Sequence, residues 1–171
     1  MEEITPEKIA EVKKMLEQRV IRAKEIEQKK KELNRHIKNS TFPLKDINWH
    51  LEMKDIDFSL SDYEGKENKE YEIINLPTDK VAHFYIKDAD KKFPKDKLFG
   101  IRTDAKIIRL IEYLQQGGKV TPPIIRYIDY KLPIMFDQGN HRFALSRFLK
   151  LNDMPFIIEK KDIEKIKALF D

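Results

Sequence analysis

Four consecutive residues, Gly139-Asn140-His141-Arg142, combine the residue types that bind phosphate. They lie between an apolar, strand-like run and a predicted helix from about His141 to Lys150. Unpaired backbone N–H groups and the positive end of the helix dipole favour an anion at such a junction. Gly139 lets the backbone approach a ligand closely, Arg142 offers a two-pronged guanidinium, and His141 offers a further donor. The turn is therefore a candidate phosphate-binding site.

Each residue of this turn also has a purely structural explanation. A glycine before a helix often serves only the turn, and a lone arginine such as Arg142 is often a solvated surface residue. His141 fits a capping or packing role equally well. Phosphoryl transfer would in addition need a carboxylate as base and metal ligand. The nearest one is Asp137, although an aspartate at a strand end commonly hydrogen bonds to its own backbone. It is a weak catalytic candidate, and no metal site is predicted.

The first segment predicts a helix from about Pro6 to Lys38, roughly 50 Å long at 1.5 Å per residue. Thr5-Pro6-Glu7 is typical of a helix start. Apolar residues recur every three or four positions and form one narrow stripe. These residues are Ile9, Val12, Leu16, Val20, Ala23, Ile26, Leu33 and Ile37. The stripe needs a partner surface, which is either the chain's own domain or a second copy in a homodimer. Non-specific nucleic-acid contact through the lysines at 29–31 is a third interpretation, but glutamates interleave with them.

The rest of the chain predicts an α/β (α+β) domain in which a mixed sheet is flanked by helices. Alternation from Ile47 to Met53 predicts a half-buried strand, so residues 1–70 are interpreted as an extension and 71–171 as the main domain. Expected strands of the main domain are Tyr71–Leu76, Val81–Ile86, Ile124–Ile128, Leu132–Phe136 and Phe156–Ile158. Expected helices begin near Thr103, His141 and Asp162, and loops are expected at Ser61–Lys69 and Lys87–Lys97.

Composition limits the chemistry further. The chain has no cysteine, which excludes disulfides, thiolate metal sites and cysteine nucleophiles and favours a cytoplasmic location. No run approaches the ~20 apolar residues that span a bilayer, so no membrane partner is expected. The net charge of +4 allows a phosphate-bearing partner without requiring one, because 30 acidic residues interleave with 34 basic ones.

The order of motifs over residues ~71–160 resembles the ParB/sulfiredoxin superfamily. Its members share a "G-x-x-x-P-I" entry to a strand, a hairpin, a "D-G-x-H-R" or "G-E-R-R" turn, and a final "I-P-x-x-I" strand. This chain offers corresponding segments at 117–125, 139–145 and 154–158. Upstream, Ile101-Arg102-Thr103-Asp104 is similar to the arginine-bearing step before the first helix of the family.

The resemblance implies a phosphate-binding turn, which relatives use for ATP, CTP or other nucleotides. A nucleoside triphosphate with Mg²⁺ is the cofactor it suggests. Carried over by position, Gly139, Asn140, His141 and Arg142 would surround the phosphates, with Arg102 on the opposite lip.

Asn140 is where the chain departs from the family. Sulfiredoxin-like members carry a catalytic cysteine at this position, so the absence of cysteine excludes that reaction. ParB-like members carry a glutamate there, and a neutral amide is a poorer Mg²⁺ ligand, which argues against a ParB-type CTPase. Kinase-like members have a histidine at this position, and Asn140 does not exclude a kinase-like activity.

Three functions follow from these observations. The first is a ParB-like domain that binds a nucleotide or another phosphate ligand in regulation or DNA association. The second is a nucleotide-dependent enzyme of the same fold, a kinase, ATPase or nuclease-like hydrolase, which needs a carboxylate cluster that the sequence does not clearly show. The third is a non-catalytic module that dimerises through the N-terminal helix. The first is preferred because it requires only the turn and Arg142.

Overall fold

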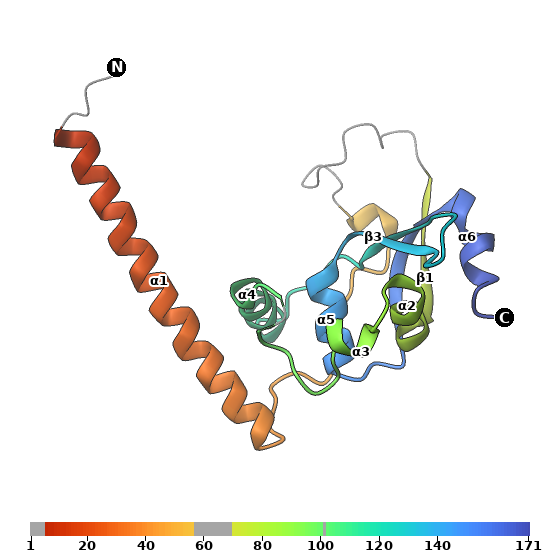
Figure 1. Ribbon diagram of the computed structural model, residues 1–171, viewed down its shortest axis with the longest axis horizontal. Coiled ribbons are helices and arrows are strands. Elements are labelled where there is room, and N and C mark those ends of the chain that lie inside the picture. The colour runs from red at the N-terminus through yellow and green to blue at the C-terminus, as the bar shows by residue number, and fades with distance from the viewer. Residues whose placement is uncertain (1–5, 57–69, 101) are drawn as a thin grey trace. The chain divides into compact units, whose positions relative to one another are not determined.

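The computed structural model describes residues 6–56, 70–100 and 102–171 (Figure 1). Its contacts divide the chain into two units, residues 1–43 and 44–171. This division differs from the predicted boundary near residue 70, because residues 44–56 group with the second unit. The first unit is essentially one helix, α1 (Pro6–Lys38), with the bounds that the sequence predicts. The predicted N-cap residue Thr5 lies outside the described residues.

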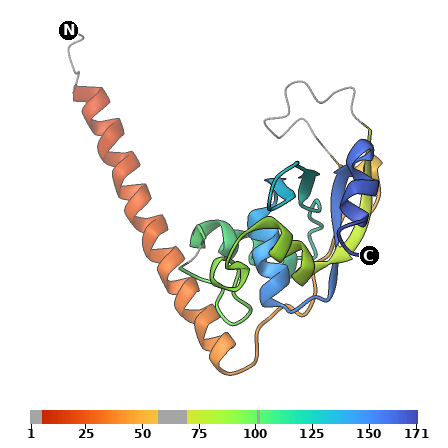
Figure 2. The same ribbon diagram turned by 45° about the vertical axis from the view of Figure 1, so that its right-hand side comes forward.

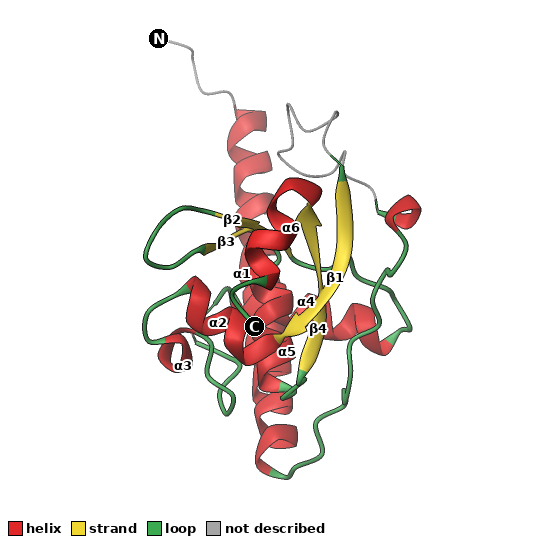
Figure 3. Ribbon diagram, turned by 90° about the vertical axis from the view of Figure 1, so that its right-hand side faces the viewer, coloured by secondary structure: helices red, strands yellow, loops and turns green. Residues whose placement is uncertain are grey.

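The second unit is a mixed α+β domain built on a four-stranded sheet (Figure 3). Its elements in chain order are η1 (Met53–Asp55), β1 (Tyr71–Pro77), α2 (Thr78–Tyr85), α3 (Ala89–Lys92), α4 (Asp104–Gln115), β2 (Ile124–Tyr127), β3 (Ile134–Gln138), α5 (Asn140–Phe148), β4 (Asp153–Glu159) and α6 (Lys160–Lys167). The strand order is β1-β4-β2-β3, with β4 central and parallel to β2, and both outer pairs antiparallel. The predicted sheet with flanking helices and the predicted β2–β3 hairpin are therefore confirmed.

The main core lies on the face of the sheet that α2 and α5 cover (Figure 2). Five successive residues of β4, 154–158, are buried, as expected for a central strand covered on both faces. Phe143 of α5 meets Phe136 of β3 and Phe156 of β4 at ring-centroid distances of 4.7 and 6.1 Å. These ring contacts fix α5, and with it the turn that precedes α5, against the sheet.

A buried arginine also fixes α5. Arg147 is 1% exposed, and its Nη2 lies 2.7 Å from Asp90 Oδ1 of α3 and 3.4 Å from Asp79 Oδ1 of α2. The hydrogen bond from Arg147 holds the pKa of Asp90 below its usual value. A buried charge is tolerated only when it is paired, so this guanidinium ties three helices together at the end of α5 remote from its first turn.

The predicted strand Val81–Ile86 is wrong, because these residues belong to helix α2 and its C-cap. Thr78, Val81 and Ala82 are the buried residues of α2, and their spacing of three and one is helical. The run is short, apolar and rich in aromatic residues, a composition that periodicity alone cannot assign to helix or strand.

The predicted strand around Trp49 is also wrong. Trp49 forms only an isolated parallel bridge with Val120, and residues 53–55 form the short helix η1. The bridge rests on two hydrogen bonds, His50 N–H to the Val120 carbonyl and Val120 N–H to the Asn48 carbonyl, each 2.9 Å. The expected loop at 87–97 contains helix α3. The expected loop at 61–69 lies outside the described residues.

Candidate anion-binding site at the start of α5

The turn between β3 and α5 has the glycine-dependent backbone that the sequence predicts. Gly139 is the N-cap of α5 with φ 94° and ψ 12°, in the left-handed region. A Cβ atom there would lie 2.6 Å from both Cα and Cβ of Pro123. Pro123 precedes β2 and Gly139 follows β3, so the antiparallel β2–β3 pair brings them together. Only glycine satisfies both the backbone conformation and this close approach.

The first turn of α5 directs backbone N–H groups to the same place. The Gly139 carbonyl accepts the first helical hydrogen bond, from the N–H of Phe143 at 2.9 Å. The N–H groups of residues 140–142 precede that bond and therefore have no partner within the helix. Together with the helix dipole, they make the start of α5 electropositive.

Three cationic side chains act electrostatically on His141 in this first turn. Burial lowers the pKa of His141 most, and the charges of Lys106, Arg102 and Arg142 lower it further. These three cations come from the first turn of α4, the segment before α4, and α5 itself, and α4 packs against α5. His141 Nε2 and Arg102 Nε are buried and lack a hydrogen-bond partner among the described residues. We call Arg102, Lys106, His141 and Arg142 the cationic cluster.

Contacts with neighbouring groups hold the two arginines of the cationic cluster in place. The guanidinium of Arg142 donates to the carbonyl of Thr121, in the segment between α4 and β2. The guanidinium of Arg102 stacks over the ring of Phe93, 4.3 Å from its centroid. Both contacts restrict the side chains before any ligand arrives, which reduces the entropy lost on binding.

The side chain of Asn140 contacts helix α2. Its Oδ1 accepts a hydrogen bond of 3.2 Å from the hydroxyl of Tyr85 on α2. Asn140 thus helps to hold α5 against α2, and its backbone N–H remains part of the first turn. The structure consequently brings Gly139, His141, Arg142 and Arg102 together around one turn, and it gives the side chain of Asn140 a different contact.

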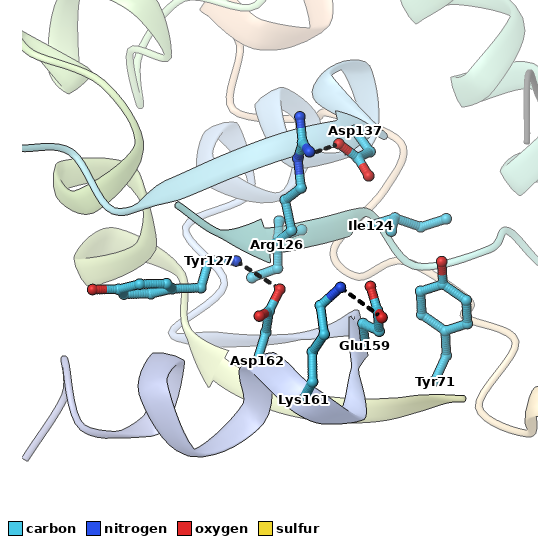
Figure 4. A pocket seen from close by; sticks show the side chains of 9 residues that line it. Tyr71, Ile124, Arg126, Tyr127, Asp137, Glu159, Lys161 and Asp162 are labelled. Carbon is cyan, nitrogen blue, oxygen red and sulfur yellow. Dashed lines mark hydrogen bonds and ion pairs between the residues drawn. The ribbon is translucent and has the colours of Figure 1, made fainter. Parts of the chain in front are cut away.

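Asp137 is directed to the other face of the sheet, into a hollow of about 360 Å³ (Figure 4). Phe136 packs in the core beneath α5, and successive residues of a strand face opposite sides, so Asp137 must face away from α5. It forms an ion pair with Arg126 of β2, with Asp137 Oδ1 and Arg126 Nε 3.0 Å apart. Asp137 is therefore not positioned as a base for chemistry at the turn.

Ion pairs and hydrogen bonds occupy the charged groups around this hollow. Lys161 Nζ lies 2.8 Å from Glu159 Oε1, and Asp162 Oδ2 accepts the backbone N–H of Tyr127 at 3.1 Å. Burial raises the pKa of the Tyr71 phenol, and the nearby carboxylates Glu159 and Asp137 raise it further. Among the described residues, no group of three or more His, Asp or Glu side chains is arranged to hold a metal ion.

Lys106 is the member of the cationic cluster that the sequence analysis missed. It is the third residue of α4, where the positive end of the helix dipole disfavours a cation. The sequence did contain a signal for Lys106. A lysine in the first turn of a predicted helix is unfavourable by itself, so its presence suggests that an anion lies nearby.

Comparison of the chain with protein-family models, curated proteins and solved structures gave no match. The resemblance to the ParB/sulfiredoxin superfamily therefore stays a prediction. No helix in the described ranges is long and apolar enough to cross a membrane.

Proposed function

We propose that the 44–171 unit is a ParB/sulfiredoxin-like domain that binds a phosphate-bearing ligand, with nucleotides as the preferred class, at the first turn of α5. The observation that carries the proposal is the cationic cluster around His141. Three cations from separate segments act on one side chain in the first turn of a helix, where the dipole is also positive. Both these cations and the dipole would attract an anion at this position.

Binding rather than catalysis is what these groups support. Arg102, Lys106 and Arg142 can each neutralise phosphate charge, and the N–H groups of the first turn can each donate to a phosphate oxygen. Phosphoryl transfer needs in addition a carboxylate as base or metal ligand, and Asp137 is directed to Arg126 on the other face of the sheet. A ligand-binding role in regulation or DNA association would require only these groups and no catalytic carboxylate.

The direct test is calorimetric titration of the full chain with inorganic phosphate, ADP, ATP, CTP and GTP, with and without Mg²⁺. We expect at least one nucleotide to bind, and Arg142→Ala to weaken that binding by about 1.5–3 kcal/mol, the range for a charged hydrogen bond. Arg142 also donates to Thr121, so its variant must be checked for stability. Lys106 is exposed, and Lys106→Ala should weaken binding without a change in the fold.

Lys131→Ala is the matched control. Lys131 is exposed in the turn between β2 and β3, and its removal lowers the net charge by the same single unit as Lys106→Ala. Affinity should be unchanged in Lys131→Ala. Equal losses of affinity in the Lys106 and Lys131 variants would mean that only the net charge of the chain matters for binding. No binding by any of the ligands would refute the proposal.

A further inference from the structure

One face of α1 is apolar and exposed over about the first half of the helix. Ile9, Val12, Leu16 and Val20 are 46%, 52%, 52% and 55% exposed, and Ala23 is exposed as well. At 100° of rotation per residue, these five residues lie within about 80° of one another around the helix axis. Helices in proteins gain most of their stability from packing of such a face, so the stripe requires a partner surface. We call these five residues the α1 stripe.

The spacing of the α1 stripe is the same in both directions along the helix. Its members are separated by three, four, four and three residues, with Leu16 at the centre. A second copy of the helix that lies antiparallel across Leu16 therefore presents the same stripe in the same register. Leu16 then meets Leu16 of the second copy, Val12 meets Val20, and Ile9 meets Ala23. This arrangement has two-fold symmetry, and one patch serves both chains.

We propose that the partner of the α1 stripe is a second copy of this chain, bound antiparallel through α1 and centred on Leu16. The charges beside the stripe select the antiparallel orientation. On one side of the stripe, Lys13 would face Glu17 of the second copy, and the two-fold axis creates this pair twice. On the other side, the aliphatic stem of Arg19 would cover Met15 of the second copy.

A parallel pair in the same register is disfavoured by its charges. The two sides of the stripe would then face each other across the interface, as the g and e positions do in a parallel coiled coil. Lys8 would face Lys13 of the second copy, and Arg19 would face Lys24. Two-fold symmetry repeats both like-charge contacts, whereas the antiparallel pair replaces them by Lys13–Glu17 contacts.

A membrane surface fits the α1 stripe less well than a second copy does. Helices that bind membrane surfaces carry broad apolar faces with Trp or Phe anchors. The α1 stripe is narrow, and α1 contains no aromatic residue. Its apolar members are medium-sized aliphatic side chains, which are the residues that interlock between paired helices.

Sedimentation velocity of the full chain over a range of concentrations tests the association. We expect a dimer for the natural sequence and a monomer for Leu16→Lys. Ile21→Lys is the matched control: Ile21 is 57% exposed but lies about 140° around the helix from Leu16, so this variant should remain a dimer. A monomer at every concentration, or equal behaviour of the two lysine variants, would overturn the proposal. Circular dichroism verifies that both variants keep α1 helical.

Single cysteines test the orientation, because the chain contains none of its own. Ile9→Cys alone should form no disulfide-linked dimer, since the two copies of residue 9 lie at opposite ends of the antiparallel pair. A mixture of Ile9→Cys and Ala23→Cys chains should give the mixed disulfide. Efficient self-linkage of Ile9→Cys would establish a parallel pair and overturn the proposed orientation. A stable dimer in which neither linkage forms would show that α1 is not the interface.

Discussion

The two faces of the sheet carry two groups of charged residues with opposite organisation. On the face covered by α5, Arg102, Lys106 and Arg142 act on His141 with charges of one sign. On the other face, acids and bases alternate around a hollow, as in the pairs Arg126–Asp137 and Lys161–Glu159. Asp137 and His141 are four residues apart in the sequence, yet they belong to different groups.

The ion pairs at the hollow and the helix N-terminus at the start of α5 affect the binding of a charged ligand in different ways. Ion pairs at the hollow cancel most of the electrostatic field that a charged ligand would experience. A ligand that had to break one of these pairs would lose part of its binding free energy. At the start of α5, the cations lie beside a helix N-terminus whose dipole has the same sign. Both the cations and the dipole attract an anion at this position, so this region is the better candidate site.

The largest effect expected from a single substitution is at Gly139. Gly139→Ala should lower the free energy of unfolding by about 2–5 kcal/mol, through a left-handed backbone conformation and a clash with Pro123. Gly117→Ala is the matched control, because Gly117 has φ 82° and no atom within 4 Å of an added Cβ. That variant should lose only about 1–2 kcal/mol. Urea unfolding measures both, and equal losses would mean that contact with Pro123 does not matter.

A smaller effect is expected at Asp137, and it separates the two faces directly. Asp137→Asn should leave nucleotide affinity unchanged and alter stability by no more than about 1 kcal/mol, because its partner Arg126 is half exposed. Titration calorimetry and urea unfolding measure the two quantities. If the substitution instead abolished nucleotide binding, or any Mg²⁺-dependent turnover that the chain showed, the hollow and the turn would have to function as one site.

The smallest expected effect is the pH dependence that His141 contributes. Its pKa is lowered from 6.5 in the folded protein, so the unfolded chain binds more protons between the two pKa values. Stability should therefore rise with pH up to about 6.5 by this contribution and should change no further above it. Conversely, a bound phosphate favours protonated His141, so affinity should increase as pH falls through the pKa of His141.

His141→Gln isolates this contribution from the other histidines of the chain. Urea unfolding and phosphate titration across pH 5–8 should both become flatter in the variant than in the natural sequence. Identical pH profiles for the two proteins would place His141 outside the binding site.

Several elements could be predicted from the sequence because their signals are local. Helix α1 begins and ends where the sequence predicts, since Pro6 favours a first helical position and no glycine or proline interrupts the segment before Pro43. The turn at Gly139 was expected for the same kind of reason, because a glycine before a helix often serves a turn. Helix α2 was mistaken for a strand because a six-residue apolar run carries too little periodicity to decide.

The sequence by itself determined the residue types at the candidate site, the absence of cysteine chemistry and the palindromic spacing of the α1 stripe. Tertiary structure decided which charges meet. Lys106 acts on His141 only because α4 packs against α5. Asp137 faces away from the turn because the preceding residue, Phe136, points into the core. The physical reason is that electrostatic interactions depend on distance in space and on burial. Both are set by packing between segments that lie far apart in the chain.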